Sequence, residues 1–190
     1  MKHELLAAGF GGQGVLSMGM TLAYAGVVEG KEITWMPSYG PEMRGGTANC
    51  TTVFSDDEIG SPIAAQYDYV IAMNQPSMER FGPLVRKGGV LLVNESMVPI
   101  CLERPDIREI YVPLVDIARE IGNERVGNVV MLGAFLSCEP KLAIDSFDKA
   151  INRVVGAKRA DIVEANLAAL RAGRKFAEEL TPEPLTGAVT

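Results

Sequence analysis

The sequence predicts a three-layer α/β fold, with a mostly parallel sheet flanked by helices, in a single domain with a helical C-terminal part. Short apolar runs typical of buried strands alternate with segments whose apolar residues have helical spacing. A glycine-rich turn follows the first apolar run, as in doubly wound sheets. The chain has 190 residues, of which 47% are hydrophobic and 22% charged, a composition that suits one folded core.

The chain opens with a strand–turn–helix–strand unit. The apolar run at residues 4–9 predicts a buried strand, and the glycines that follow predict a tight turn. Residues 15–29 have the spacing of a helix, which Gly30 ends. A second strand begins at residues 33–36. This order is the usual opening of a doubly wound sheet.

Residues 37–47 (PSYGPEMRGGT) contain two prolines and three glycines and predict a loop. Eleven residues are more than a connection between two elements needs. The length therefore favours a functional role for this loop.

The next elements are read from composition and turn signals. Further strands are predicted at residues 48–54, 69–73, 90–94 and 109–112. A helix is predicted to begin after Asn74, to break at Gly82-Pro83 and to end at Gly88-Gly89. Four more helices are predicted at residues 115–121, 126–137, 142–155 and 160–180.

The C-terminal part of the chain carries two further expectations. Gly127 and Gly133 are expected to let the helices at 115–121 and 126–137 approach each other closely. The domain is expected to span residues 1–180 and to be followed by a tail at 181–190, either frayed or wrapped around a partner.

Charge and composition exclude several classes of function. Eighteen Lys and Arg against 24 Asp and Glu give a net charge of −6, which disfavours binding to nucleic acid or anionic membranes. The apolar run at 129–138 is far shorter than the roughly 20 residues of a membrane span. The N-terminus lacks the features of a signal peptide, so a cytoplasmic location is expected.

Few cysteine and histidine residues are available to bind a metal. Three scattered cysteines and one histidine predict neither a disulfide framework nor a zinc site or iron–sulfur cluster held by this chain alone.

The first candidate site is the turn Gly9-x-Gly11-x-x-Gly14. Such glycines allow backbone N–H groups at a helix N-terminus to face an anion. A dinucleotide site also needs an acidic residue at the end of the second strand, where this chain has Trp35-Met36-Pro37-Ser38. The turn is therefore interpreted either as a site for an anion or phosphate-bearing ligand, or as a tight turn without a ligand.

The second candidate site is the loop around Arg44. Its guanidinium suits phosphate or carboxylate, and Gly45 and Gly46 expose N–H groups beside it. Tyr39 and Met43 suit a protein interface. Ligand contact, partner contact and an internal Arg44–Glu42 pair all remain open.

Other candidates have simpler interpretations. Cys50 is expected to be a small buried residue rather than a nucleophile. The acidic run at 56–58 is read as a solvated turn rather than a metal site. Asn128 is expected to be a buried hydrogen-bonding residue, or else to reach a ligand. No motif of a catalytic nucleophile or base occurs, so no catalytic residue is assigned.

Several motifs together resemble the gamma subunit of 2-oxoacid:ferredoxin oxidoreductases, over about residues 4–180. They are GFGGQGV at 9–15, PSYGPEMRGGTANC at 37–50, Ser55 with IGSP at 59–62, residues 68–77, and Asn128 with LGA at 132–134. The resemblance implies a subunit of a complex that oxidatively decarboxylates a 2-oxoacid to its acyl-CoA and passes electrons to ferredoxin. It also implies the α/β fold of the third domain of single-chain pyruvate:ferredoxin oxidoreductases.

In that family this chain would be non-catalytic, supporting assembly and coenzyme A binding. Thiamine diphosphate would lie between alpha and beta subunits, and iron–sulfur clusters would belong to another subunit. The implied coenzyme-binding residues are Gly11, Gly12, Gln13, Gly14, Tyr39, Arg44, Gly45 and Gly46.

The form of the loop favours 2-oxoglutarate as substrate of the complex, with a branched-chain 2-oxoacid or pyruvate as alternatives. Two other classes stay open. One is a stand-alone binder of a phosphate-bearing small molecule, and the other is a purely structural subunit.

Overall fold

A computed structural model describes residues 2–40, 45–139, 142–156 and 159–180. In these residues six strands form one sheet: β1 (Lys2–Phe10), β2 (Glu32–Tyr39), β3 (Thr47–Ser55), β4 (Tyr67–Ala72), β5 (Val85–Asn94) and β6 (Arg108–Val112). The helices are α1 (Val15–Val28), α2 (Gln75–Phe81), α3 (Leu114–Ile121), α4 (Gly127–Cys138), α5 (Ile144–Val155) and α6 (Ala160–Leu180). Short 3-10 turns are η1 (Gly82–Leu84), η2 (Glu95–Met97) and η3 (Glu124–Val126). The predicted tail, 181–190, lies outside the described residues.

The strand order is β2-β3-β1-β4-β5-β6. The pairs β1–β4, β4–β5 and β5–β6 are parallel. β3 is antiparallel to both β1 and β2, so β2 runs in the same direction as β1. Only β3 is reversed, and the predicted mostly parallel sheet is confirmed.

The hairpin of β2 and β3 differs from the predicted loop. Pro37, Ser38 and Tyr39, expected in the loop, belong to β2, where Tyr39 pairs with Ala48. A proline is tolerated there because β2 is the edge strand of the sheet. β3 also separates β2 from β1, since Ala48 pairs with Gly9 on its other side. β3 therefore lies between the first two strands of the chain.

β5 begins earlier than predicted. It starts at Val85 and runs through Gly88-Gly89, which were expected to end the preceding segment. The register against β4 shifts here, from Tyr67 opposite Val85 to Tyr69 opposite Val90. Glycine at 89 marks this bulge because a Cβ there would lie 2.7 Å from the Asp68 carbonyl oxygen.

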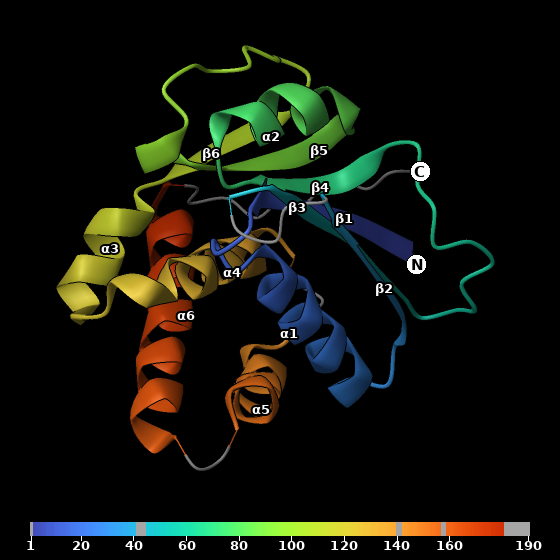
Figure 1. Cartoon of the computed structure of the whole chain (residues 1–190). Coiled ribbons are helices and arrows are strands. Elements are labelled where there is room, and N and C mark those ends of the chain that lie inside the picture. The colour runs from blue at the N-terminus through green and yellow to red at the C-terminus, as the bar shows by residue number, and fades with distance from the viewer. Residues whose placement is uncertain (1, 41–44, 140–141, 157–158, 181–190) are drawn as a thin grey trace.

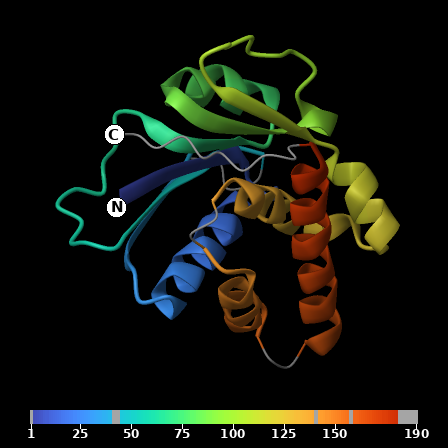
Figure 2. The ribbon, with the colours of Figure 1, turned by 180° about the vertical axis from the view of Figure 1, so that it is seen from behind.

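The sheet separates two helical layers of unequal size. Figures 1 and 2 show α2 on one face and α1, α4, α5 and α6 on the other. Successive side chains of β1 point to opposite faces of the sheet and so reach both layers. Leu5 and Ala7 belong to the larger core, and Leu6 belongs to the smaller one. None of the described helices is both long and apolar enough to cross a membrane.

α4 and α6 pack closely against each other in the larger layer. A Cβ on Gly133 of α4 would overlap the carbonyl oxygen of Leu170, and one on Gly173 of α6 would overlap that of Val130. The close approach expected of Gly133 therefore involves α6, not the preceding helix α3. Gly127 has only an ordinary neighbour, the Leu114 side chain at 3.7 Å from a built Cβ.

Candidate functional site

The glycine-rich turn lies at the carboxyl end of β1, where the topology of the sheet divides. From β1 the chain enters α1 on one face of the sheet, and from the neighbouring β4 it enters α2 on the opposite face (Figure 1). Ligands of open α/β sheets bind outside the carboxyl ends of strands at such a point. The turn predicted from the sequence is therefore at the position that best suits a binding site in this fold.

The conformation of the turn requires glycine at its last position. Gly14 is the N-cap of α1 and is left-handed, with φ 73° and ψ 17°. A Cβ there would also lie 2.5–2.9 Å from the side chain of Asn128. Asn128 Nδ2 donates to the Gly14 carbonyl oxygen at 3.4 Å. The start of α4 thus packs directly over the turn.

Gln13 uses its side chain inside the protein. Its Oε1 accepts from the Phe10 N–H at 2.7 Å and from Asn74 Nδ2 at 3.0 Å. Its Nε2 donates to the carbonyl oxygen of Met73 at 3.0 Å. The side-chain amide of Gln13 therefore holds the turn against the end of β4 and is not left free for a ligand.

Two N–H groups of the turn are already engaged. Gly11 N donates to the Gly46 carbonyl oxygen at 2.9 Å, and Gln13 N donates to that of Phe10 at 3.1 Å. The N–H groups of Gly12 and Gly14 have no hydrogen-bond partner among the described residues. These two groups are what the turn leaves available to a ligand.

The second predicted motif meets the first through the Gly11–Gly46 bond. Gly45, directly before Gly46 in the same loop, has a φ of 74°. Tyr39 is 60% exposed and lies at the same edge of the sheet, because Ala48 pairs with both Tyr39 and Gly9. Arg44 lies outside the described residues, so its predicted role stays a prediction.

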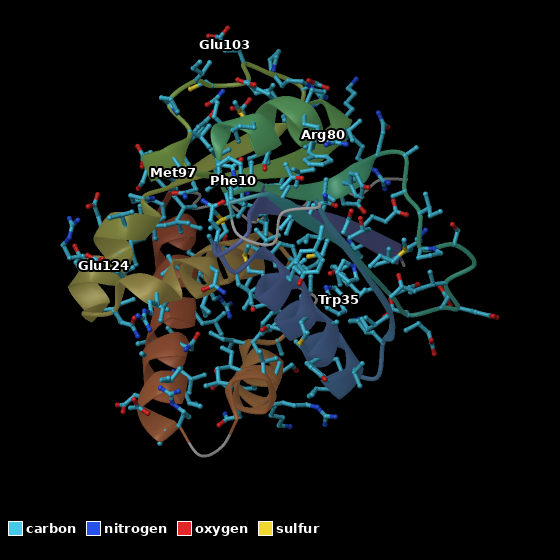
Figure 3. The ribbon with its side chains drawn as sticks, in the orientation of Figure 1. Phe10, Trp35, Arg80, Met97, Glu103 and Glu124 are labelled. Carbon is cyan, nitrogen blue, oxygen red and sulfur yellow. The ribbon has the colours of Figure 1, made fainter. Side chains whose placement is uncertain are left out.

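A pocket of about 590 Å³ opens beside the turn. Its residues come from the turn and α1, from the ends of β4 and β5, and from the starts of α3 and α4: Gly12, Gln13, Gly14, Ser17, Met73, Asn94, Leu114, Val115, Glu124, Arg125, Gly127 and Asn128. Figure 3 shows Met97, which follows β5, and Glu124, which precedes α4, on the same side of the molecule as Phe10 at the end of β1.

Three helices begin at this pocket without a capping side chain. The N-caps of α1, α3 and α4 are Gly14, Pro113 and Val126, and none makes a side-chain cap bond. Neither α1 nor α4 carries an acidic residue in its first turn, and α3 carries Asp116. Free N–H groups and the positive ends of the helix dipoles favour an anion at this place.

The side chains at the pocket add one cation and several amides. Arg125 is exposed and forms no ion pair with any described residue. Its position is set by η3, where Asn123 Oδ1 accepts from the Arg125 N–H at 3.1 Å. Asn94 ends β5, is 5% exposed, and donates through Nδ2 to the Met73 carbonyl oxygen at 3.1 Å.

Two other candidates lie away from this pocket. Cys50 is fully buried, as expected, and burial raises the pKa of its thiol to about 11. The acidic run at 56–58 is exposed, and Asp56 pairs with Lys31 at 2.9 Å. The Lys31 ammonium lowers the pKa of the Asp56 carboxyl to about 2. Within the described ranges no group of three His, Cys, Asp or Glu is arranged to hold a metal ion.

Sequence reasoning missed Asn94 and Arg125 as pocket residues. A signal for Asn94 was present, since Asn74 and Asn94 each end or follow an apolar strand. Parallel strands bring their carboxyl ends to one edge of the sheet, so the two amides could be expected to lie near the turn. Arg125 had no comparable signal, because its place depends on how α3 and α4 pack.

Comparison with known proteins matches residues 4–176 to the family model described as pyruvate ferredoxin/flavodoxin oxidoreductase. The chain is 42% identical over 173 residues to ketoisovalerate oxidoreductase subunit VorA of Methanothermobacter thermautotrophicus, covering 90% of this chain and 36% of that protein. It thus spans about a third of that relative's length.

Two further relatives match along nearly their whole length. The 2-oxoglutarate synthase subunit KorC of Methanocaldococcus jannaschii is 33% identical, with 95% of this chain and 96% of that protein covered. The solved gamma subunit of a keto/oxoacid ferredoxin oxidoreductase from Geobacter sulfurreducens superposes with a TM-score of 0.79 at 28% identity, covering 93% of this chain and 99% of that one. The motifs, the fold and these similarities agree, and the chain belongs to the pyruvate ferredoxin/flavodoxin oxidoreductase family.

Proposed function

We propose that this chain is a non-catalytic gamma-type subunit of a 2-oxoacid:ferredoxin oxidoreductase, supporting assembly and coenzyme A binding. The match to KorC over nearly the full length of both chains supports a separate subunit of this type. The complex would decarboxylate a 2-oxoacid oxidatively, form its acyl-CoA and pass the electrons to ferredoxin.

The observation that carries the coenzyme role is the convergence of three uncapped helix N-termini on one pocket at the switch point of the sheet. Coenzyme A carries several phosphate charges, which suit the N–H groups of Gly12 and Gly14 and the Arg125 guanidinium. In this proposal the chain binds and orients the coenzyme, and no bond-making step is assigned to its residues.

The other cofactors would be held by partner chains. Only three cysteines occur in the sequence, and two of them, Cys50 and Cys138, are buried separately. Such a set does not fit an iron–sulfur cluster. We therefore propose that the clusters belong to an iron–sulfur subunit, and that thiamine diphosphate lies between alpha and beta subunits, as the family resemblance implies.

The 2-oxoacid is proposed to be 2-oxoglutarate, as the loop sequence favours and as the KorC relative is named. A branched-chain 2-oxoacid is the second candidate, because the 42% identical relative is a ketoisovalerate oxidoreductase subunit.

The proposal is tested on the complex purified from native cells through a tag on this chain. We expect thiamine-binding and cluster-binding chains to co-purify, with coenzyme A-dependent reduction of a viologen dye. Comparing 2-oxoglutarate with 3-methyl-2-oxobutanoate as substrate decides between the two candidates. A monomer that purifies without partners would overturn the subunit role and favour the stand-alone binder.

Replacing the two arginines tests the coenzyme role directly. We expect Arg44→Ala and Arg125→Ala each to raise the KM for coenzyme A by about tenfold, as the loss of a charge-assisted hydrogen bond predicts. The matched control is Arg80→Ala on α2, which does not line the pocket and lies across the sheet from α1 and α4 (Figures 1 and 3). An unchanged KM in both test variants would remove the coenzyme role and leave the assembly role standing.

A further inference from the structure

Asn94 leaves one buried polar atom unused at the pocket. Its side chain lies at the end of β5, and the residue is 5% exposed. Nδ2 donates to the Met73 carbonyl oxygen at 3.1 Å. Oδ1 is buried and has no hydrogen-bond partner among the described residues. Asn94 also lines the pocket beside the glycine turn.

The orientation of this amide is determined by its surroundings. The Met73 carbonyl accepts from both Asn94 Nδ2 and Gln13 Nε2, at 3.1 and 3.0 Å. Turning the Asn94 amide over would place two oxygens against each other, which is unfavourable. Oδ1 is therefore held as an acceptor, and a buried acceptor without a partner costs free energy that a donor would recover.

Apart from the Glu124 carboxylate, the groups that line the rest of the pocket favour an anion, not a donor. The N-termini of α1, α3 and α4 and the Arg125 side chain offer N–H groups and positive charge. Inorganic phosphate would satisfy these groups and leave Asn94 Oδ1 unpaired. A ligand that satisfies both parts carries an anionic group and, on an organic arm, an N–H or O–H donor.

We propose that Asn94 is a specificity-determining residue that accepts a hydrogen bond from an amide N–H or hydroxyl on the organic arm of a phosphate ester. The inference rests on the proposed coenzyme A role of this pocket. It adds which part of the coenzyme Asn94 recognises. The pantetheine arm of coenzyme A carries two amides and a hydroxyl, and its phosphates would lie toward the helix N-termini.

The test uses the native complex, wild type and Asn94→Ala, with two ligands measured by calorimetry. Adenosine bisphosphate carries phosphates of the coenzyme without its pantetheine arm. We expect Asn94→Ala to weaken coenzyme A binding by about tenfold, the size of one lost hydrogen bond, and adenosine bisphosphate binding by less than about twofold. The control is Asn152→Ala, an exposed asparagine on α5, which should change neither affinity.

The outcomes separate the two proposals. Wild-type complex that binds no coenzyme A would overturn the coenzyme role itself, and with it this inference. Wild-type binding that Asn94→Ala leaves unchanged, or an equal loss for both ligands, would overturn the role of Asn94 alone.

A second measurement needs no variant and tests the role of Asn94 even if Asn94→Ala fails to fold. Coenzyme A analogues with N-methylated pantetheine amides or an O-methylated hydroxyl lack these donors one at a time. We expect one of them to bind the wild-type complex about tenfold more weakly than coenzyme A. Equal affinity for coenzyme A and every analogue would contradict the inference.

Discussion

Gln13 links the glycine-rich turn to the neighbouring strand through its side-chain amide. It accepts from the Phe10 N–H and Asn74 Nδ2 and donates to the Met73 carbonyl, which Asn94 also contacts. Amides from three segments thus form a chain of hydrogen bonds across the ends of β1, β4 and β5. This chain of bonds holds the shape of the turn, so that the N–H groups of Gly12 and Gly14 stay available.

Removing the Gln13 amide should destabilise the protein measurably. We expect Gln13→Ala to lower the free energy of unfolding by about 2–3 kcal/mol, because three hydrogen bonds are lost and the Phe10 N–H loses its acceptor. Urea unfolding measures this difference. The control is Gln66→Ala, whose exposed side chain makes no hydrogen bond with the described residues and should cost less than about 0.5 kcal/mol. Equal losses in the two variants would contradict the role of Gln13.

The three cysteines should react at very different rates. Cys50 is buried and its thiol has a pKa of about 11, so at pH 8 about 0.1% would be thiolate even if reagent could enter. Burial also raises the pKa of Cys138, whereas Cys101 is exposed. We expect iodoacetamide at pH 8 to label Cys101 in the native protein and all three in urea.

The pH dependence of labelling checks the physical cause. Because the pKa of Cys50 is raised, its thiol stays protonated in the folded protein and ionises more readily on unfolding. Labelling of Cys50 should therefore rise only as the pH approaches about 11, where the free energy of unfolding also falls. Fast labelling of Cys50 at pH 8, located by peptide mass spectrometry, would show that the thiol is not held in this environment.

At the level of elements, the contact between α4 and α6 depends on glycines facing backbone. α4 is apolar on all sides because it lies between the sheet and α6, with nine of its residues buried. Gly133 and Gly173 remove the side chains that would separate the two helices. The start of α4 carries Gly127 and Asn128, so this packing also sets how the helix meets the pocket.

Adding one methyl group at position 133 should therefore be costly. We expect Gly133→Ala to lower the free energy of unfolding by more than about 3 kcal/mol, because its Cβ would overlap the Leu170 carbonyl in a packed interior. Thermal or urea unfolding gives the value. Gly127→Ala in the same helix is the matched control, since its Cβ would be 3.7 Å from Leu114.

The control should be neutral or stabilising, because alanine favours helix more than glycine does. If Gly133→Ala were as stable as Gly127→Ala, the close packing of α4 against α6 would be wrong.

At the scale of the whole molecule, the position of the pocket follows from strand order. β1 lies next to β4, and the helices that follow these two strands cover opposite faces of the sheet (Figure 2). This divergence leaves an opening at the carboxyl ends that α3 and α4 line from one side. The inserted antiparallel β3 brings the loop residue Gly46 against Gly11, so the two sequence motifs meet at this same edge.

The glycine turn, the helix that follows it, the α/β class and the family could all be predicted from the sequence, because periodicity, turn residues and motif spacing are local properties. It did not determine the order of the strands, the extension of β2 to Tyr39, or the start of β5 at Val85. Those features depend on hydrogen bonds between segments distant in the chain.

The composition of the pocket was likewise decided by tertiary structure. Asn128 reaches Gly14 from 114 positions away, and Asn94 reaches Met73 from 21 positions away on a neighbouring strand. Which side chains meet the turn depends on strand pairing and helix packing, and neither leaves a signal within a short window of sequence. The turn could be predicted because the spacing of its glycines is a local property of the sequence, whereas the side chains around it are brought there by the fold.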